Sequence, residues 1–283
     1  MDTSSSTLLQ RVSRSFRIIG NALGISSARY ATHSEVSSYL HQHLECVAAD
    51  LNWPAWSPRW LGVSSTGSLL FRLESIECPS KCIAIGRYAS HTSMSSGVAE
   101  PSLPRILLNP AAGIERESRV YQSLAHHGLT PRLLFADTCC LVNEYVDAER
   151  LSDVLRRDPE QIWLWLPKVL DAISAMHRFN EHHLDLNCGN ILVQPTSGLV
   201  RFVDFEYEVS PEIELPQSQS FDYVRFLHGV LKRRRGEKAI QRDPTRFLQV
   251  CRTHIPSEIR RRAMTFPAAV LGRTLRYSTI FET

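Results

Sequence analysis

The segment from His183 to Glu206 constrains this chain more than any other part of its sequence. It reads H-L-D-L-N-C-G-N-I-L-V-Q-P-T-S-G-L-V-R-F-V-D-F-E, so Asp185 and Asn190 stand five residues apart in a polar stretch. Two short apolar runs follow, separated by a Pro-Thr-Ser-Gly turn, and the second run leads into Asp204. Apolar runs on either side of such a turn predict a loop followed by a β-hairpin that ends in a carboxylate.

These three polar side chains are of the kinds that in-line phosphoryl transfer requires. The reaction needs a carboxylate that orients the acceptor hydroxyl and accepts its proton, and oxygen ligands for the magnesium that bridges the phosphates. The sequence offers Asp185 as the base, Asn190 as a catalytic-loop residue and metal ligand, and Asp204 as the second metal ligand. An apolar pattern at helical spacing runs directly into His183 and supplies the expected context. We therefore expect ATP and Mg²⁺ as cofactors.

Residue by residue, this pattern resembles the catalytic loop and metal-binding aspartate of the protein-kinase-like superfamily. The resemblance implies an α+β, two-lobed protein-kinase-like fold, with a small antiparallel β-sheet lobe carrying one helix and a mainly helical second lobe. We expect these lobes at residues 60–145 and 146–283. A helical lead-in at 35–59 and a basic amphipathic or disordered segment at 1–34 would precede them.

The resemblance also implies nucleotide contacts in the first lobe. Residues 61–73 read as strand, Gly/Ser loop and strand, so the loop containing Gly62 and Gly67 would cover the phosphates. A Gly/Ser hairpin turn has the same composition. The segment Leu141 to Val146 matches the hinge, where the carbonyl of Glu144 and the N–H of Val146 would face the adenine edge.

The family's phosphate-binding lysine has no direct counterpart here. On the predicted strand Cys82 to Tyr88 we favour Arg87, with Lys81 and Arg105 as the other candidates, because arginine keeps a positive charge for the phosphates. Glu117 matches the glutamate that pairs with this cation, although a surface glutamate in an i,i+4 pair has the same pattern.

A further position of the family can be matched after the hairpin. Asp222 resembles the buried aspartate that supports the backbone of the catalytic loop. An acidic residue that favours a helix N-terminus is the alternative interpretation.

The departures from the family pattern indicate the acceptor. Leu184 and Asn187 stand where Ser/Thr protein kinases have arginine and lysine, and no A-P-E motif lies between Asp204 and Asp222. The strings H-x-D-L-N-x-x-N-I-L and D-F-E are similar to those of the lipopolysaccharide-core kinases that act on Kdo or heptose. D-F-E-Y is similar to choline kinases, and R-E-x-x-x-x-x-x-L to aminoglycoside phosphotransferases.

This resemblance implies a kinase of a sugar or lipid-linked hydroxyl more than of a protein. An atypical Ser/Thr protein kinase exported as an effector is the second hypothesis. A nucleotide-binding pseudokinase that acts as a scaffold is the third.

Composition limits the partners and the cellular location that we expect. The net charge of +3 gives no basis for nucleic-acid binding, and no apolar run approaches the length of about 20 residues that spans a membrane. Seven cysteines without a C-x-x-C pair are typical of free thiols, so we expect a cytoplasmic protein. Residues 3–34 contain no acidic residue and carry arginines among apolar residues at helical spacing, which suits peripheral membrane contact, an export signal or a tail.

Overall fold

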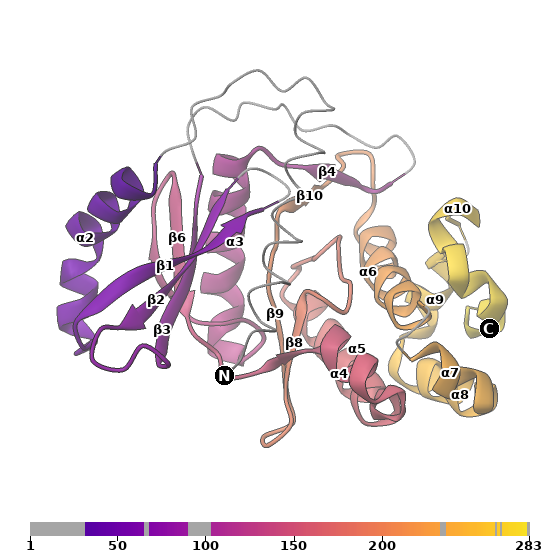
Figure 1. Cartoon of the computed structure of the whole chain (residues 1–283). Helices are drawn as coiled ribbons and strands as arrows, with labels where there is room; N and C mark the ends of the chain where they lie inside the picture. The colour runs from indigo at the N-terminus through magenta and orange to yellow at the C-terminus, as the bar shows by residue number, and fades with distance from the viewer. Residues whose placement is uncertain are drawn as a thin grey trace, which may run out of the picture. The chain divides into compact units, whose positions relative to one another are not determined.

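The computed structural model describes residues 32–64, 68–89, 103–232, 236–263, 265–266 and 268–281 (Figure 1). Helices and antiparallel strands are both abundant in it, which confirms the expected α+β class. The chain separates into two compact units, residues 1–94 and 95–283, and each is described by itself. The expected amphipathic segment lies outside the described residues as far as residue 31, and Gly67 lies outside them too.

The first unit is a helix followed by three antiparallel strands. They are α2 (His33–Asp50), β1 (Trp56–Val63), β2 (Leu69–Ser75) and β3 (Cys82–Tyr88). A capping box between Thr32 and Glu35 starts α2, because each residue's side chain satisfies an amide of the other. Apolar side chains recur on one face of α2 and are buried, and stacked pairs of aromatic rings join this helix to β1: Val36, Leu40, Leu44, His33–Trp60 and His41–Trp56.

Two boundaries in this unit differ from the sequence prediction. The helical lead-in is expected at 35–59, but α2 begins at His33, because its cap is Thr32, and it ends at Asp50. Trp56 already belongs to β1. Aromatic residues favour strands, and here the ring of Trp56 is buried against α2, so packing extends the strand into the Trp-Pro-Ala-Trp segment. The strand at Cys82–Tyr88 is where the sequence predicts it.

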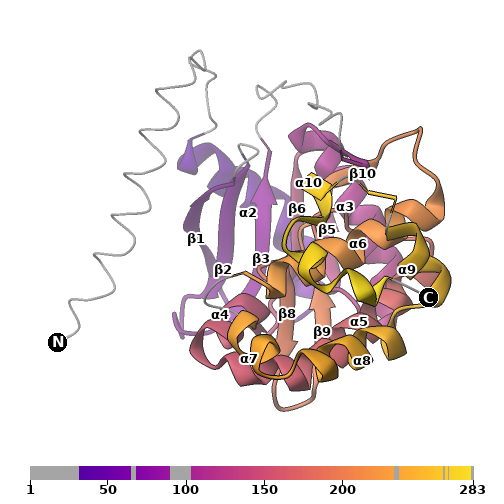
Figure 2. The ribbon, with the colours of Figure 1, turned by 90° about the vertical axis from the view of Figure 1, so that its right-hand side faces the viewer.

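Among the described residues, the second unit holds four short antiparallel strand pairings and most of the helices (Figure 2). Its strands are β4 (Arg105–Leu107), β5 (Leu133–Ala136), β6 (Cys140–Glu144), β7 (Glu149–Arg150), β8 (Ile191–Gln194), β9 (Leu199–Phe202) and β10 (Tyr207–Val209). Its α-helices are α3 (Pro110–Leu124), α4 (Leu151–Arg157), α5 (Ile162–Arg178), α6 (Leu215–Val230), α7 (Glu237–Arg242), α8 (Pro244–His254), α9 (Ser257–Ala263) and α10 (Ala268–Leu271). Short 3₁₀ turns occupy Ala125–His127, Pro159–Gln161 and Gly272–Ile280.

The compact units divide at residue 94, and α3 packs on β5 and β6 within the second of them. The expected division into lobes at 145 stays a prediction. Asn109 caps α3 by accepting from the N–H of Ala112, and Pro110 occupies its first turn, where a missing N–H costs nothing.

The predicted helix and hairpin around the polar loop are both present. Every apolar residue that predicted the helix before the loop is buried on α5: Leu166, Val169, Leu170, Ile173 and Met176. After the loop, β8 and β9 pair from Ile191 with Phe202 to Gln194 with Leu199. Gly198 ends the turn with φ 72°, a backbone conformation that residues with a Cβ rarely adopt. The loop is thus fixed between a buried helix and a hairpin.

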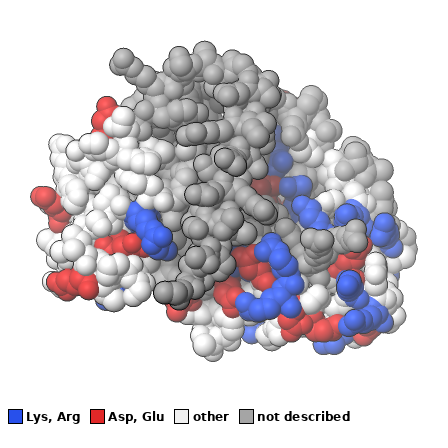
Figure 3. Space-filling model, viewed as in Figure 1, with Lys and Arg blue, Asp and Glu red and all other residues white. Residues whose placement is uncertain are grey.

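The helices that follow the hairpin cover this core. α8 packs on α5 and α9 packs on α6 (Figure 2). Over the helical part of the second unit, Lys and Arg surfaces lie among Asp and Glu surfaces, so neither sign of charge prevails there (Figure 3). All seven cysteines are free. None of the described helices has both the length and the apolar composition needed to cross a membrane.

Candidate functional site

A single carboxylate on α6, that of Asp222, binds the backbone of the polar loop. Asp222 is fully buried, and its Oδ2 accepts from the N–H of His183 at 3.0 Å while its Oδ1 accepts from the N–H of Leu184 at 2.6 Å. The ring of His177 on α5 contacts the same Oδ2 at 3.0 Å. Leu184 has φ 63°, which is costly for a residue with a Cβ and persists only where surrounding bonds enforce it.

Asp222 therefore supports the loop, as the resemblance implies. The alternative, an acid at a helix N-terminus, is wrong because α6 begins at Leu215 and Asp222 lies two turns inside it. Burial by itself raises the pKa of Asp222, but the hydrogen bond from His177 and the charges of the neighbouring histidines outweigh burial and lower it.

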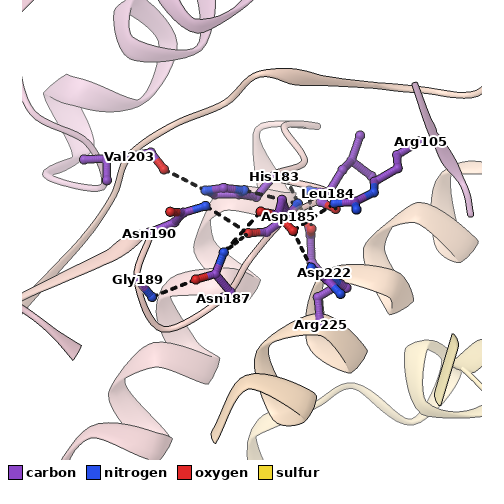
Figure 4. Close-up of polar contacts among 10 residues, drawn as sticks. All are labelled: Arg105, His183, Leu184, Asp185, Asn187, Gly189, Asn190, Val203, Asp222 and Arg225. Atoms are coloured by element: carbon purple, nitrogen blue, oxygen red, sulfur yellow. Dashed lines mark hydrogen bonds and ion pairs between the residues drawn. The ribbon is translucent and has the colours of Figure 1, made fainter. Parts of the chain in front are cut away.

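His183 ties the loop to the end of the hairpin. Its Nδ1 faces the N–H of Asp185 at 3.4 Å, so Nε2 carries the hydrogen and donates to the carbonyl of Val203 at 2.9 Å (Figure 4). The N–H of Val203 in turn donates to the carbonyl of Asn190 at 3.1 Å. These bonds bring Asn190 beside the segment that carries Asp204.

The two asparagines of the loop are oriented by Asp185. Asn190 donates from Nδ2 to the carbonyl of Asp185 at 3.1 Å, so its Oδ1 is the amide atom left to face a ligand. Asn187 donates to the same carbonyl at 3.2 Å and to Oδ2 of Asp185 at 3.1 Å, while its own Oδ1 accepts from the N–H of Gly189 at 2.8 Å.

Two arginines from outside the loop converge on the other oxygen of Asp185. Arg105 of β4 donates from Nη1 to Oδ1 at 2.8 Å, and Arg225 of α6 donates to the same atom from Nη2. Burial by itself raises the pKa of Asp185, but the charge and hydrogen bond of Arg225, followed by the charge of Arg105, outweigh burial and lower it. Asp185 is therefore ionised at neutral pH.

The segment after the hairpin is held by two adjacent side chains of α3. Oε1 of Glu117 accepts from the N–H of Asp204 at 3.1 Å, and Asp204 has φ 74°. Arg116 donates to the carbonyl of His182 at 2.7 Å and to the carbonyl of Tyr207. Glu117 is 4% exposed, so the interpretation as a surface glutamate is wrong.

The other residues predicted to bind nucleotide lie apart from this network in the sequence. Gly62 is the next-to-last residue of β1 and has φ 138°, next to a register shift in the pairing of β1 with β2. Arg87 is buried in β3 of the first unit, whereas Glu117 belongs to the second unit, so their pairing stays a prediction. In β6 the side chain of Glu144 contacts Arg201 at 3.3 Å. The carbonyl of Val146 accepts from the N–H of Ala148.

Sequence reasoning missed part of the site. Arg225 lies three residues after Asp222 and therefore on the same face of α6, but no motif marks it. The family pattern points to Arg105 only as a replacement for the first-lobe lysine, and it gives Arg116 no role. The spacing after Asp222 was a usable signal, but the pairing of β4 with β10 that delivers Arg105 has no local signal.

A second group of potential metal ligands lies under the loop. The ligand atoms of His177, His182 and Asp222 all lie within 4.8 Å of one another, and the three residues are buried. Both oxygens of Asp222 already accept hydrogen bonds from the loop backbone. We therefore assign this group to support of the loop.

No protein-family model matches the sequence, and no curated protein is significantly similar to it.

Proposed function

We propose that this chain is an ATP-dependent phosphotransferase of the protein-kinase-like fold, which moves the γ-phosphate to a hydroxyl of a carbohydrate or lipid-linked small molecule. The observation that carries the proposal is the fixed loop between α5 and β8. A buried carboxylate holds its backbone, Asp185 is ionised in it, and Asn190 lies beside the segment of Asp204. An ordinary surface turn needs neither a buried carboxylate under its backbone nor polar side chains held together in this way.

The residues present fit a magnesium ion. Mg²⁺ prefers oxygen ligands and takes few of them from the protein. Asn190 has its amide nitrogen bound to the carbonyl of Asp185, which leaves Oδ1 as the donor, and Asp204 adds a carboxylate next to Val203. When bound, the ion would neutralise charge on the phosphates.

In this mechanism the residues of the loop act on the acceptor. Asp185 orients the hydroxyl and accepts its proton. Its lowered pKa keeps it ionised and makes it a weak base, so its main contribution is to orient the hydroxyl. Asn187, bound to Oδ2, restrains the rotation of the carboxylate. Asp222 and His177 act through the backbone and are positioning residues.

For the nucleotide, the proposal keeps the residues named from the sequence. Gly62 and Gly67 would cover the phosphates and Arg87 would bind them, with Glu117 as its partner. The carbonyl of Glu144 and the N–H of Val146 would face the adenine.

The segment after Asp204 favours a small acceptor over a peptide. β10 pairs with β4 from Tyr207 with Leu107 to Val209 with Arg105, and two flanking backbone bonds, Leu108 to Glu206 and Ser210 to Pro104, extend the pairing. A segment bonded along its length has few free backbone groups with which to bind an extended peptide. Peripheral contact with a membrane through residues 1–34, where a lipid-linked acceptor would lie, belongs to the same proposal.

A phosphate-acceptor screen with labelled Mg-ATP tests the proposal. The purified chain is offered protein, its own side chains, lipopolysaccharide and free sugars, beside the Asp185→Ala variant. We expect transfer to a sugar or lipid-linked acceptor, reduced about 10²–10⁴-fold in the variant, because positioning of a general base contributes on that order. Preferred transfer to protein would favour the atypical protein kinase. Nucleotide binding without transfer to any acceptor would favour the pseudokinase.

A further inference from the structure

Two positively charged side chains contact the single negative charge of the Asp185 carboxylate. Arg105 and Arg225 both donate to its Oδ1, and Arg105 also donates to the carbonyl of Leu184 at 3.1 Å. The guanidinium of Arg105 lies 4.1 Å from the centroid of the Tyr207 ring, which fixes its plane. At this oxygen one carboxylate faces two guanidinium groups, while the carboxylates of Asp204 and Glu206 act on the nearby Tyr207 hydroxyl.

Both arginines also retain unused hydrogen-bond donors. The Nε atoms of Arg105 and Arg225 are buried and have no acceptor among the described residues. The side chain of Arg105 is only 10% exposed. A buried donor that stays unpaired costs about 1–3 kcal/mol, and more when it is charged. A shift of the two side chains that brought these atoms to a ligand oxygen would remove that cost.

The loop itself offers no cation for the reaction. Residues 183–190 contain neither lysine nor arginine. Phosphoryl transfer spreads negative charge over the oxygens of the moving group, and catalysis depends on cations placed near them. Arginine suits this role because its planar fork matches an oxyanion bidentately.

We propose that Arg105 and Arg225 form an oxyanion-binding site beside Asp185. The oxyanion is either the transferred phosphoryl group or an anionic group of the acceptor molecule. The inference rests on the proposed function and deepens it, because it gives the site a charge requirement that the loop does not meet alone. It also explains why an arginine from β4 and an arginine from α6 meet at one oxygen atom (Figure 4).

The first test measures binding without turnover. Melting temperatures of the full chain are followed while sodium sulfate replaces chloride at constant ionic strength, for wild type, Arg105→Gln, Arg225→Gln and the double variant. Arg156→Gln is the matched control, because its Nη1 also lies 2.8 Å from a carboxylate Oδ1, that of Asp153, on the exposed surface. We expect sulfate to stabilise wild type and the control more than the double variant, which keeps only the general stabilisation that sulfate gives any folded protein. An equal shift in the double variant, or no sulfate shift in wild type, overturns the proposal.

The second test separates the two sources of the oxyanion. On an acceptor that wild type phosphorylates, a fall in kcat of about 100-fold in the glutamine variants, with an unchanged KM for the acceptor, assigns the site to the phosphoryl group. A raised KM for the acceptor with kcat retained assigns it to an anionic group of that molecule. Arg105→Lys and Arg225→Lys should recover part of either loss, because they keep the charge.

The failures of the two proposals are distinguishable. Unchanged kcat and KM in the double variant overturn the oxyanion site while the phosphotransferase stands. Absence of transfer by wild type to any acceptor removes the phosphotransferase, and the sulfate titration then decides the oxyanion site by itself. A loss of turnover in variants that still bind sulfate like wild type would reduce both arginines to positioning residues and overturn the inference.

Discussion

The two ends of the candidate site are held in different ways. At the end that carries Asp185, one fully buried carboxylate, Asp222 of α6, fixes two successive backbone amides and a histidine ring. At the end that carries Asp204, two adjacent residues of α3 share the work. Glu117 accepts from the amide of Asp204, and Arg116 donates to carbonyls on both sides of the hairpin.

Because the two anchors differ, changes at them should have different effects on folding stability and on function. The α6 anchor is a single fully buried carboxylate, so its removal leaves two buried amides and a histidine ring without their acceptor at once. The α3 anchor is divided between two side chains, and the carboxylates that face Arg116 lie at 3.7 Å (Glu208) and 3.8 Å (Glu181), longer than direct hydrogen bonds. We expect damage at the α6 anchor to affect folding and turnover together. Damage at the α3 anchor should affect mainly the placement of Asp204.

The largest effect should follow removal of the α6 anchor. Asp222→Ala leaves the amides of His183 and Leu184 and the ring of His177 without their acceptor, and loss of one partner in a buried charged network typically costs about 3–5 kcal/mol. Urea unfolding measures the loss. Asp171→Ala is the control, because that aspartate also contacts a histidine, His254, but is exposed. A loss below about 1 kcal/mol would contradict the role given to Asp222.

The second-largest effect is a dependence of folding stability on pH, and its source is His182. Burial lowers the pKa of His182 to about 4, with His177 and Arg116 adding to the shift and Asp222 and Glu208 opposing it. Above pH 6.5 the histidine is neutral in both the folded and the unfolded chain and contributes no pH dependence. As pH falls from 6.5 toward 4, His182 binds a proton in the unfolded chain but not in the folded chain. The free energy of unfolding therefore falls by up to about 3 kcal/mol.

His182→Gln isolates this contribution. Because other groups also titrate in that range, the quantity to compare is the difference in unfolding free energy between wild type and variant at pH 7 and at pH 4.5. Wild type should lose more stability than the variant over this interval. Parallel pH profiles would show that His182 is protonated in the folded chain.

Local patterns were sufficient for the loop and for its immediate frame. The apolar spacing before His183 predicts α5, and the Pro-Thr-Ser-Gly turn predicts the hairpin, because both signals are contained in a few consecutive residues. Asp185, Asn190 and Asp204 lie within this frame. Asp222 is matched by the same reasoning, but the helix that carries it begins at Leu215, where Pro216 in the first turn is the local signal of a helix start.

Contacts between distant segments were beyond these patterns. Arg105 reaches Asp185 across 80 residues of sequence, and Arg116 reaches Tyr207 across 91. Both contacts depend on where α3 and the β4–β10 pair lie, and a one-residue change of register would turn Arg105 to the other face. Single-sequence reasoning has no access to that register.

The smallest effect should appear at the α3 anchor. Glu117→Gln keeps an oxygen that can accept from the amide of Asp204 but removes its charge, and a hydrogen bond to a neutral group is weaker by about 1 kcal/mol. The melting temperature should therefore change little. Stabilisation by Mg-ATP should weaken about fivefold in apparent affinity, since Asp204 is held less firmly where a metal needs it. Glu115→Gln on the exposed side of the same helix is the control and should match wild type. If Glu117→Gln instead destabilised the apo chain as much as Asp222→Ala, the two anchors would be equivalent and the contrast between them would fail.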